Sequence, residues 1–572
     1  MRPTSRLDDL QQKARQPNVV MKSAELGTAR QTRHSFSRAL VRHAARDGWK
    51  VSTRIWDLDK EGQGRAVYTV DFGTGTVELV LFSHVIDEET RDDRVIAQDW
   101  DVTVALVLGI ATEAQLEDLS KNVTRQEDGR ANSNSLIWGR ANRSQRFFSY
   151  VVDCLAAGKQ PEADQMSDAA YILRSTAFYG NGKFGLKDFD GFTPGHPLGT
   201  PYRIQMLAAW LLREFSSDLA NHCAKAKSDS AVMLDPSWRR YLGLGNATGL
   251  GMVPYPIRHP QVFDAWVALR ELPLTNALEQ QWAPESEALQ RLANLIQRAT
   301  TYFSEKLSFE TAPYPTGPEL SEKLSPFIEC IKEFQASRTM QGQLVTHPGK
   351  RLHELAELES VEVRQIIDSI LIELDSSIDD DIEKLLTCVD RTYLDSEMLV
   401  SELSEIVESL YGWTSEFDFN DKKETGKFWF YSENSQEPRR GRRGKDKGLA
   451  TEHPVGVAKD VFELKKDLSN SPSDQSVGIF VSIHPKHWGI VERIQSISNI
   501  PYAEAQVNPL SDDFLPLDLQ RFQLAVYGME NFNPQSTDWL RVTLYQGAPI
   551  VSDLSDPSLL DDWLFKPKPK GM

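Results

Sequence analysis

Two glycine-rich segments contain the residues of this chain whose types and spacing could bind a ligand. The first reads Gly180-Asn181-Gly182-Lys183-Phe184-Gly185, and the second reads Gly243-Leu244-Gly245-Asn246-Ala247-Thr248-Gly249-Leu250-Gly251. Glycine permits positive φ angles and lets backbone N–H groups converge, which is how a backbone anion site is built. We therefore expect glycine and polar residues of both segments to contact a ligand: Asn181, Gly182, Lys183, Asn246 and Thr248.

Neither segment is a nucleotide-binding fingerprint, although the first matches the GxGxxG spacing. A dinucleotide site needs a strand before the glycines and a helix directly after them. Pro194 follows the first segment within a run of acidic and glycine residues, and Pro254 and Pro256 follow the second. A GxxxxGK[ST] run is also absent from the sequence. The cofactor is therefore left open.

The region around the two segments is locally basic. Ten lysines and arginines stand against six aspartates and glutamates between Tyr171 and His259, a difference of +4, whereas the whole chain has a formal net charge of -18. A carboxylate or a phosphate would be attracted to such a region. The basic residues expected to bind this small anionic molecule are Arg174, Lys183, Arg239, Arg240 and Arg258.

Two histidines of this region are candidate catalytic groups. His259 and His196 could carry a proton, because the pKa of histidine lies near neutrality. The alternative is that both are packing or capping residues and that the glycine segments are two tight turns between helices. The sequence leaves both interpretations open.

No metal site is predicted. The histidines of His484-Pro485-Lys486-His487 lack an obvious third ligand nearby, and the proline prevents a helical pairing of the two rings. The four cysteines are far apart and form no CxxC pair. We expect reduced thiols and a cytoplasmic protein.

Composition excludes several classes of protein. The chain has 572 residues, of which 40% are hydrophobic, and its mean hydropathy is -0.42, so a soluble protein with several cores is expected. Long uncharged apolar runs are absent, which argues against membrane insertion. The acidic net charge makes nucleic-acid binding unlikely through bulk electrostatics.

The order of patterns predicts an α+β multidomain protein. We divide it into a mobile tail (1–24), an α+β domain with a helix and an antiparallel meander (25–165), a mainly helical domain carrying both glycine segments (166–345), an acidic amphipathic helical block (346–415) and a C-terminal β-containing region (416–572). The clearest predicted helices are Tyr202–Cys223, Val262–Leu272 and Pro284–Phe303. Strands are predicted in the meander and the C-terminal region: Lys50–Trp56, Ala66–Phe72, Val77–His84, Lys427–Tyr431, Val477–His484, Phe522–Tyr527 and Asp538–Tyr545.

Three functions are compatible with these patterns. The first is a cytoplasmic enzyme that acts on a small anionic metabolite, with its site in the two glycine segments. The second is a non-catalytic scaffold that docks a partner, or a second copy, through the acidic helices 350–412. The third is nucleic-acid binding through the arginine-rich run Arg439–Lys447. The sequence does not decide whether the chain is an enzyme.

Overall fold

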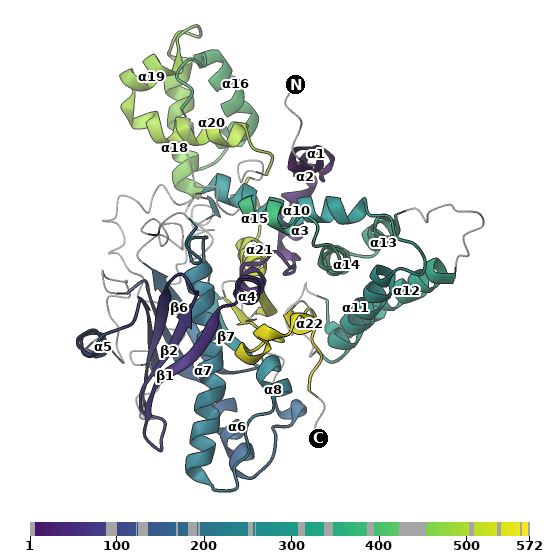
Figure 1. Cartoon of the computed structure of the whole chain (residues 1–572). Helices are drawn as coiled ribbons and strands as arrows, with labels where there is room; N and C mark the ends of the chain where they lie inside the picture. Colours follow the sequence, from purple (N-terminus) through teal and green to yellow (C-terminus); the bar gives the residue numbers. More distant parts are fainter. Residues whose placement is uncertain are drawn as a thin grey trace. The chain divides into compact units, whose positions relative to one another are not determined.

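The computed structural model describes most of the chain (Figure 1), and the chain divides into two compact units. The described residues are 6–86, 100–121, 123, 135–166, 170–180, 192, 195–249, 256–257, 259–306, 315–336, 347–385, 394–421, 454–502, 508–534, 539–560 and 563–569. Unit 1 comprises Met1–Ala29, Gly249–Glu279 and Asp375–Gln523, and unit 2 comprises Arg30–Thr248, Gln280–Leu374 and Leu524–Met572. The predicted α+β multidomain class is confirmed, but each unit is assembled from separate segments rather than from one continuous stretch.

Unit 2 is built on a nine-stranded mixed sheet with the order β1-β2-β3-β4-β5-β6-β7-β9-β8. The strands are β1 (Lys50–Leu58), β2 (Gly64–Asp71), β3 (Thr76–Ser83), β4 (Val102–Leu108), β5 (Ile137–Arg143), β6 (Tyr171–Gly180), β7 (Gly243–Gly249), β8 (Met529–Pro534) and β9 (Trp539–Leu544). Strands β1 to β6 form an antiparallel meander, whereas β6 and β7 are parallel. The predicted N-terminal meander is thus confirmed, and the C-terminal strands join the same sheet.

One long helix, α7 (Arg203–Lys227), forms the crossover between β6 and β7 and is buried on almost every side. It packs on the sheet face that carries Tyr68, whose hydroxyl donates to Asp218 at 2.7 Å. Near the C-terminal end of α7, His222 Nε2 donates to the carbonyl of Asp59, just after β1, at 2.6 Å. The alternating directions of the meander place the end of β1 at the edge where β6 begins. The N-terminus of α7 therefore points to the edge where β6 and β7 end.

Shorter helices surround this core in unit 2. They are α4 (Phe36–Arg46), α5 (Glu113–Ser120), α6 (Phe147–Ala156), η1 (Ala163–Gln165), α8 (Pro236–Tyr241), α11 (Glu287–Ser304), α12 (Gly317–Ala336), α13 (Pro348–Glu357), α14 (Val361–Glu373), η6 (Val551–Ser555) and α22 (Pro557–Leu560). Helix α5 covers the face of the meander opposite α7, where Leu116 and Leu119 pack against Val107 and Trp138.

Unit 1 is helical in its described part. Its helices are α1 (Arg6–Lys13), α2 (Pro17–Val20), α3 (Ser23–Gly27), α10 (Pro260–Leu278), α15 (Asp379–Leu385), α16 (Val400–Tyr411), η3 (Gly412–Ser415), α18 (Pro454–Ser469), α19 (Val477–Ile483), η4 (Pro485–His487) and α20 (Trp488–Ser498), and α21 (Pro516–Tyr527) begins in this unit. Helices α16, α18, α19 and α20 share one apolar core. None of the described helices has the length and apolar character needed to cross a membrane.

Two predicted strands are wrong, and a third, Lys427–Tyr431, lies outside the described residues. Val477–His484 forms α19, whose N-terminus is capped by Ser476, and Phe522–Tyr527 belongs to α21. Both segments are short apolar runs in which β-branched and aromatic residues favour a strand locally. Packing of these runs against neighbouring helices decides the outcome instead, since short apolar runs are ambiguous by periodicity.

Residues 6–24, for which the sequence predicts a mobile tail, form helices α1 and α2 and the start of α3, and a buried ion-pair network contacts this segment. Arg15 donates to both carboxylate oxygens of Glu271 at 2.8 Å, and Arg15 also pairs with Glu25 at 2.8 Å. Glu271 is fully buried. Burial would raise the pKa of Glu271, but Arg15 and Arg270 hold it at about 2.

We expect the substitution Arg15→Leu to lower the free energy of unfolding of the chain by about 3 kcal/mol, because it leaves a buried carboxylate with one of its two arginines. Denaturant unfolding followed by circular dichroism measures the change. Lys13→Ala is the matched control, since its pairs with Asp9 and Glu279 are exposed and contribute little. Equal effects of the two substitutions would contradict this account of the N-terminal helices.

Candidate functional site

Most of the second glycine segment forms a strand, whereas the sequence pattern was interpreted as a ligand-binding loop or a tight turn between helices. Residues Gly243–Gly249 form β7, and Asn246 and Thr248 therefore lie on this strand. A Cβ atom at Gly245 would meet the ring of Tyr171 at 2.6 Å. Glycine is needed here because a neighbouring side chain lies against the backbone.

The carboxyl ends of β6 and β7 lie at one edge of the sheet, which we call the carboxyl edge. Their parallel register pairs Tyr171 with Gly243 and Ser175 with Asn246. Neighbouring strands lie about 4.8 Å apart, so the two strands reach this edge side by side. The residues of the first glycine segment that follow β6, Asn181, Gly182 and Lys183, are outside the described residues.

His196 lies near the carboxyl edge. Its ring stacks on Phe192 with the ring centroids 4.1 Å apart, and it contacts Phe72 edge-on at 6.0 Å. Phe72 directly follows β2, which runs in the same direction as β6 and therefore ends at the same edge.

The hydrogen bonds of His196 determine the role that its ring can have. The backbone N–H of Leu198 donates to Nδ1 at 3.0 Å, so this arrangement assigns the proton of the neutral ring to Nε2. Burial lowers the pKa of His196. The ring is therefore suited to donate a hydrogen bond from Nε2. It is less suited to accept a proton, because Nδ1 is already occupied by a donor.

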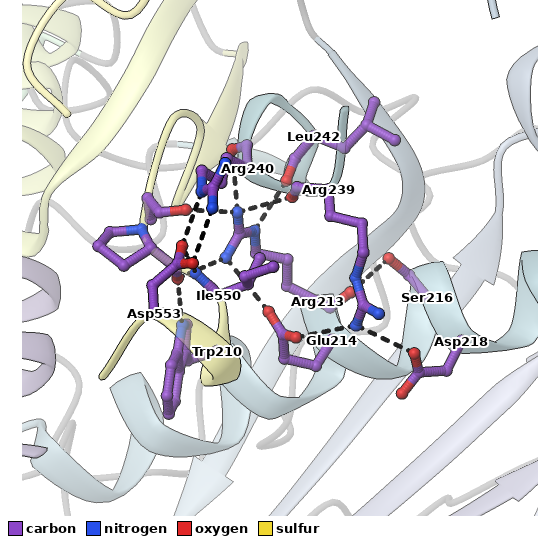
Figure 2. A network of polar contacts seen from close by, with 12 residues as sticks. Trp210, Arg213, Glu214, Ser216, Asp218, Arg239, Arg240, Leu242, Ile550 and Asp553 are labelled. Atoms are coloured by element: carbon purple, nitrogen blue, oxygen red, sulfur yellow. Dashed lines mark hydrogen bonds and ion pairs between the residues drawn. The ribbon is translucent and has the colours of Figure 1, made fainter. Parts of the chain in front are cut away.

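Arg239 and Arg240 lie on α8, at the opposite edge, where β7 begins (Figure 2). Arg239 pairs with Glu214 and Asp218, both at 3.0 Å. Arg240 makes a bidentate pair with Asp553 at 2.7 and 2.8 Å. The seven residues of β7 span about 23 Å. The structure thus separates these two arginines from the carboxyl edge and pairs both with carboxylates.

Arg213 is the centre of the network in Figure 2. Its guanidinium donates to five backbone carbonyls at 2.8–3.0 Å, those of Leu242, Pro549, Arg239, Arg240 and Ala548. The residue is almost fully buried, and burial lowers its pKa to about 10. It ties α7 to α8 and to the segment after β9. Sequence reasoning missed this residue, although an arginine inside an apolar helix pattern was an available signal.

Arg174 and Asn246 lie on opposite faces of the sheet. Arg174 stands opposite Gly245, whereas Asn246 stands opposite the next residue along, Ser175. Arg174 is half-buried and forms no ion pair within the described part of the chain. It lies six residues before the end of β6, about 20 Å from the carboxyl edge. The side chain of Thr248 is outside the description.

The remaining candidates are placed elsewhere. His259 is the N-cap residue of α10 in unit 1, and Arg258 and the run Arg439–Lys447 are outside the described residues. The acidic helices 350–412 do not form one block, because α13 and α14 belong to unit 2 and α15 and α16 to unit 1. Helix α14 is mostly buried, so its carboxylates do not form an exposed docking face.

The histidines of the sequence His484-Pro485-Lys486-His487 contact one carboxylate. Asp467 lies 2.8 Å from His487 Nε2 and 3.8 Å from His484 Nδ1. It also pairs with Lys486 at 2.9 Å. Among the residues that the structure describes, no group of three side chains has the arrangement of a metal site.

Comparison of the chain with protein-family models, curated proteins and solved structures finds no match. The interpretation of the carboxyl edge therefore depends on its own geometry.

We expect Arg213→Lys to destabilise the protein by about 3–5 kcal/mol, because an ammonium group cannot reach all five carbonyls and leaves several buried acceptors unpaired. Thermal and denaturant unfolding measure the loss. Arg65→Lys is a control, since Arg65 makes one ion pair with an exposed glutamate, Glu113, on the sheet surface. A stability of Arg213→Lys equal to that of the control would show that the network does not hold α7 in place.

We expect His196 to remain neutral at neutral pH and to carry its proton on Nε2, because burial lowers its pKa below the usual 6.5. Nitrogen NMR of ring-labelled protein distinguishes the two neutral tautomers and follows the titration. The ring should titrate at a lower pH than an exposed histidine does. A ring that is protonated at neutral pH, or that carries its proton on Nδ1, would contradict the hydrogen bond from Leu198.

Proposed function

We propose that this protein binds a small anionic metabolite, a carboxylate or a phosphate compound, at the carboxyl edge and acts on it as an enzyme. The observation that carries the proposal is the parallel pairing of β6 with β7 around the crossover helix α7. In open sheets, ligands bind outside the carboxyl ends of parallel strands, near the point where the strand order changes direction.

Two kinds of donor would serve an anion there. The residues Asn181, Gly182 and Lys183 directly follow β6 in the sequence and would supply backbone N–H groups, an amide and an ammonium. The N-terminus of α7 points to the same edge and carries the positive end of a 25-residue helix dipole. His196 also has an Nε2–H donor at this edge, but it lies beside Phe72 at the end of β2, four strands away from β6. Together these donors favour a ligand with a carboxylate or phosphate group.

We also propose that the protein works in the cytoplasm. The described cysteines Cys154, Cys223 and Cys330 are free thiols, as expected where the environment is reducing. No described feature favours the scaffold or the nucleic-acid function over the enzyme.

A thermal-shift screen of carboxylate and phosphate metabolites tests this function, because a ligand that binds only the folded state raises the unfolding midpoint. We expect a hit whose affinity falls about tenfold or more in Gly180→Val, since a side chain at the end of β6 blocks approach to the backbone. Gly75→Val is the matched control, because Gly75 has open space around it.

The proposal fails if no compound shifts the midpoint. It also fails if Gly180→Val binds the hit as tightly as the control Gly75→Val and the unmodified protein do.

A further inference from the structure

Two arginines of the sheet in unit 2 have no carboxylate partner. Arg174 on β6 is half-buried and Arg541 on β9 is exposed, and neither makes a hydrogen bond or an ion pair within the part of the chain that the structure describes. The chain has 82 acidic against 64 basic residues, so carboxylates are abundant. A half-buried guanidinium without an anion is unfavourable. An anion from outside the chain would compensate this charge.

The strand register places both arginines on the same face of the sheet. Arg174 stands opposite Gly245 of β7, so the two residues point to the same side. Strand β9 is the next neighbour of β7, and a Cβ atom at Gly243 would meet the methyl group of Thr543 at 2.5 Å. Thr543 therefore lies on the face that Gly243 and Gly245 share. Arg541, two residues before Thr543, points to this side as well, because alternate residues of a strand share a face.

The strand between the two arginines contributes no side chain of its own at its two nearest positions on this face. Gly243 and Gly245 occupy these positions, and the ring of Tyr171 lies over Gly245 as a floor. The backbones of β6 and β9 are two strand spacings apart, about 10 Å. Two long, flexible arginine side chains on either side of β7 can therefore contact one ligand between them. Because Arg541 is exposed, this part of the face is open to solvent.

Asn142 adds a neutral donor beside Arg174. It stands opposite Arg174 on β5 and shares its face, which is the face that α5 covers farther along the strand at Trp138. The side-chain carbonyl of Asn142 accepts the backbone N–H of Asp101 at 3.0 Å. This hydrogen bond orients the amide and leaves its NH2 group without a partner among the described residues.

The carboxylates near these positions are bound elsewhere. Glu530 on β8 accepts a hydrogen bond from Gln31 at 2.6 Å. Asp101, which precedes β4, accepts the backbone N–H of Arg143 at 2.8 Å. Neither carboxylate forms an ion pair with the two arginines. The positive charge of this face is therefore not cancelled by direct ion pairs in the described part of the chain.

We propose that this face binds a phosphate monoester between Arg174 and Arg541, with Asn142 as a neutral donor. A phosphate monoester carries up to two charges and three terminal oxygens, so both guanidinium groups can donate to it. A carboxylate offers one charge and two oxygens, which a single arginine already satisfies. This site goes beyond the function proposed above, because it lies on the face of the sheet and uses none of the residues assigned to the carboxyl edge.

The test measures how inorganic phosphate and methyl phosphate change the unfolding midpoint of the full-length protein, at constant ionic strength set with chloride. Both compounds should raise the midpoint of the unmodified protein. Arg174→Gln and Arg541→Gln should each need about tenfold more of either compound for the same rise. Dimethyl phosphate, which carries one charge, should have little effect. Each rise is measured from the midpoint of the same variant without phosphate, so a change in basal stability does not enter.

Arg65→Gln is the matched control. It removes the same charge from the same face of the sheet, but Arg65 lies on β2, where it pairs with Glu113 of α5 at 3.1 Å. This variant should keep the full phosphate response, and so should Gly180→Val, which alters only the carboxyl edge. The comparison therefore separates the proposed site from general stabilisation by phosphate as a salt and from binding at the carboxyl edge.

Three outcomes would overturn the proposal. The first is that neither phosphate nor methyl phosphate changes the midpoint of the unmodified protein at matched ionic strength. The second is that Arg174→Gln and Arg541→Gln respond as Arg65→Gln does. The third is that dimethyl phosphate acts as strongly as methyl phosphate. If Arg174→Gln does not fold, the exposed position 541 decides the second outcome alone.

Discussion

Parallel pairing of β6 with β7 is the constraint on which the arrangement of unit 2 depends. Two parallel neighbours cannot be joined by a hairpin, so the chain must return across the sheet before the second strand begins. Helix α7 makes this return, and its burial on almost every side explains why its sequence is apolar around most of its circumference. The same crossover brings both strand ends and the helix N-terminus to one edge.

The buried guanidinium of Arg213 holds the crossover in place at the edge where β7 begins. Arg213 donates to carbonyls of α8, of the residue before β7 and of the segment after β9, so one side chain connects three separate parts of the chain. Its neighbours Arg239 and Arg240 pair with Glu214, Asp218 and Asp553. Arg239 and Arg240 are therefore paired with carboxylates inside the protein, and an anion at the carboxyl edge depends on other donors.

Sequence patterns predicted the meander and the crossover helix because their periodicity is long and regular, as for Tyr202–Cys223. The strand predictions for short apolar runs such as Val477–His484 were wrong, since tertiary packing overrides the local strand preference of so few residues. The hydrophobic periodicity of a segment does not show which strands pair with each other in the sheet. The sequence therefore located the glycine segments but missed that Gly243–Gly249 is a strand, and it grouped Arg239 with residues from the opposite edge.

The central claim, that β6 and β7 run in parallel to a shared edge, is tested most directly by chemical cross-linking. Continuing the register of Ser175 with Asn246 by two residues places Ala177 opposite Thr248, about 5 Å away. In a background with its native cysteines replaced, a short bis-maleimide should join Ala177→Cys to Thr248→Cys within one chain. It should not join Ala177→Cys to Ser237→Cys, on α8 at the other edge. Cross-linking of Ala177→Cys to Ser237→Cys but not to Thr248→Cys would show that the two glycine segments do not end at the same edge of the sheet.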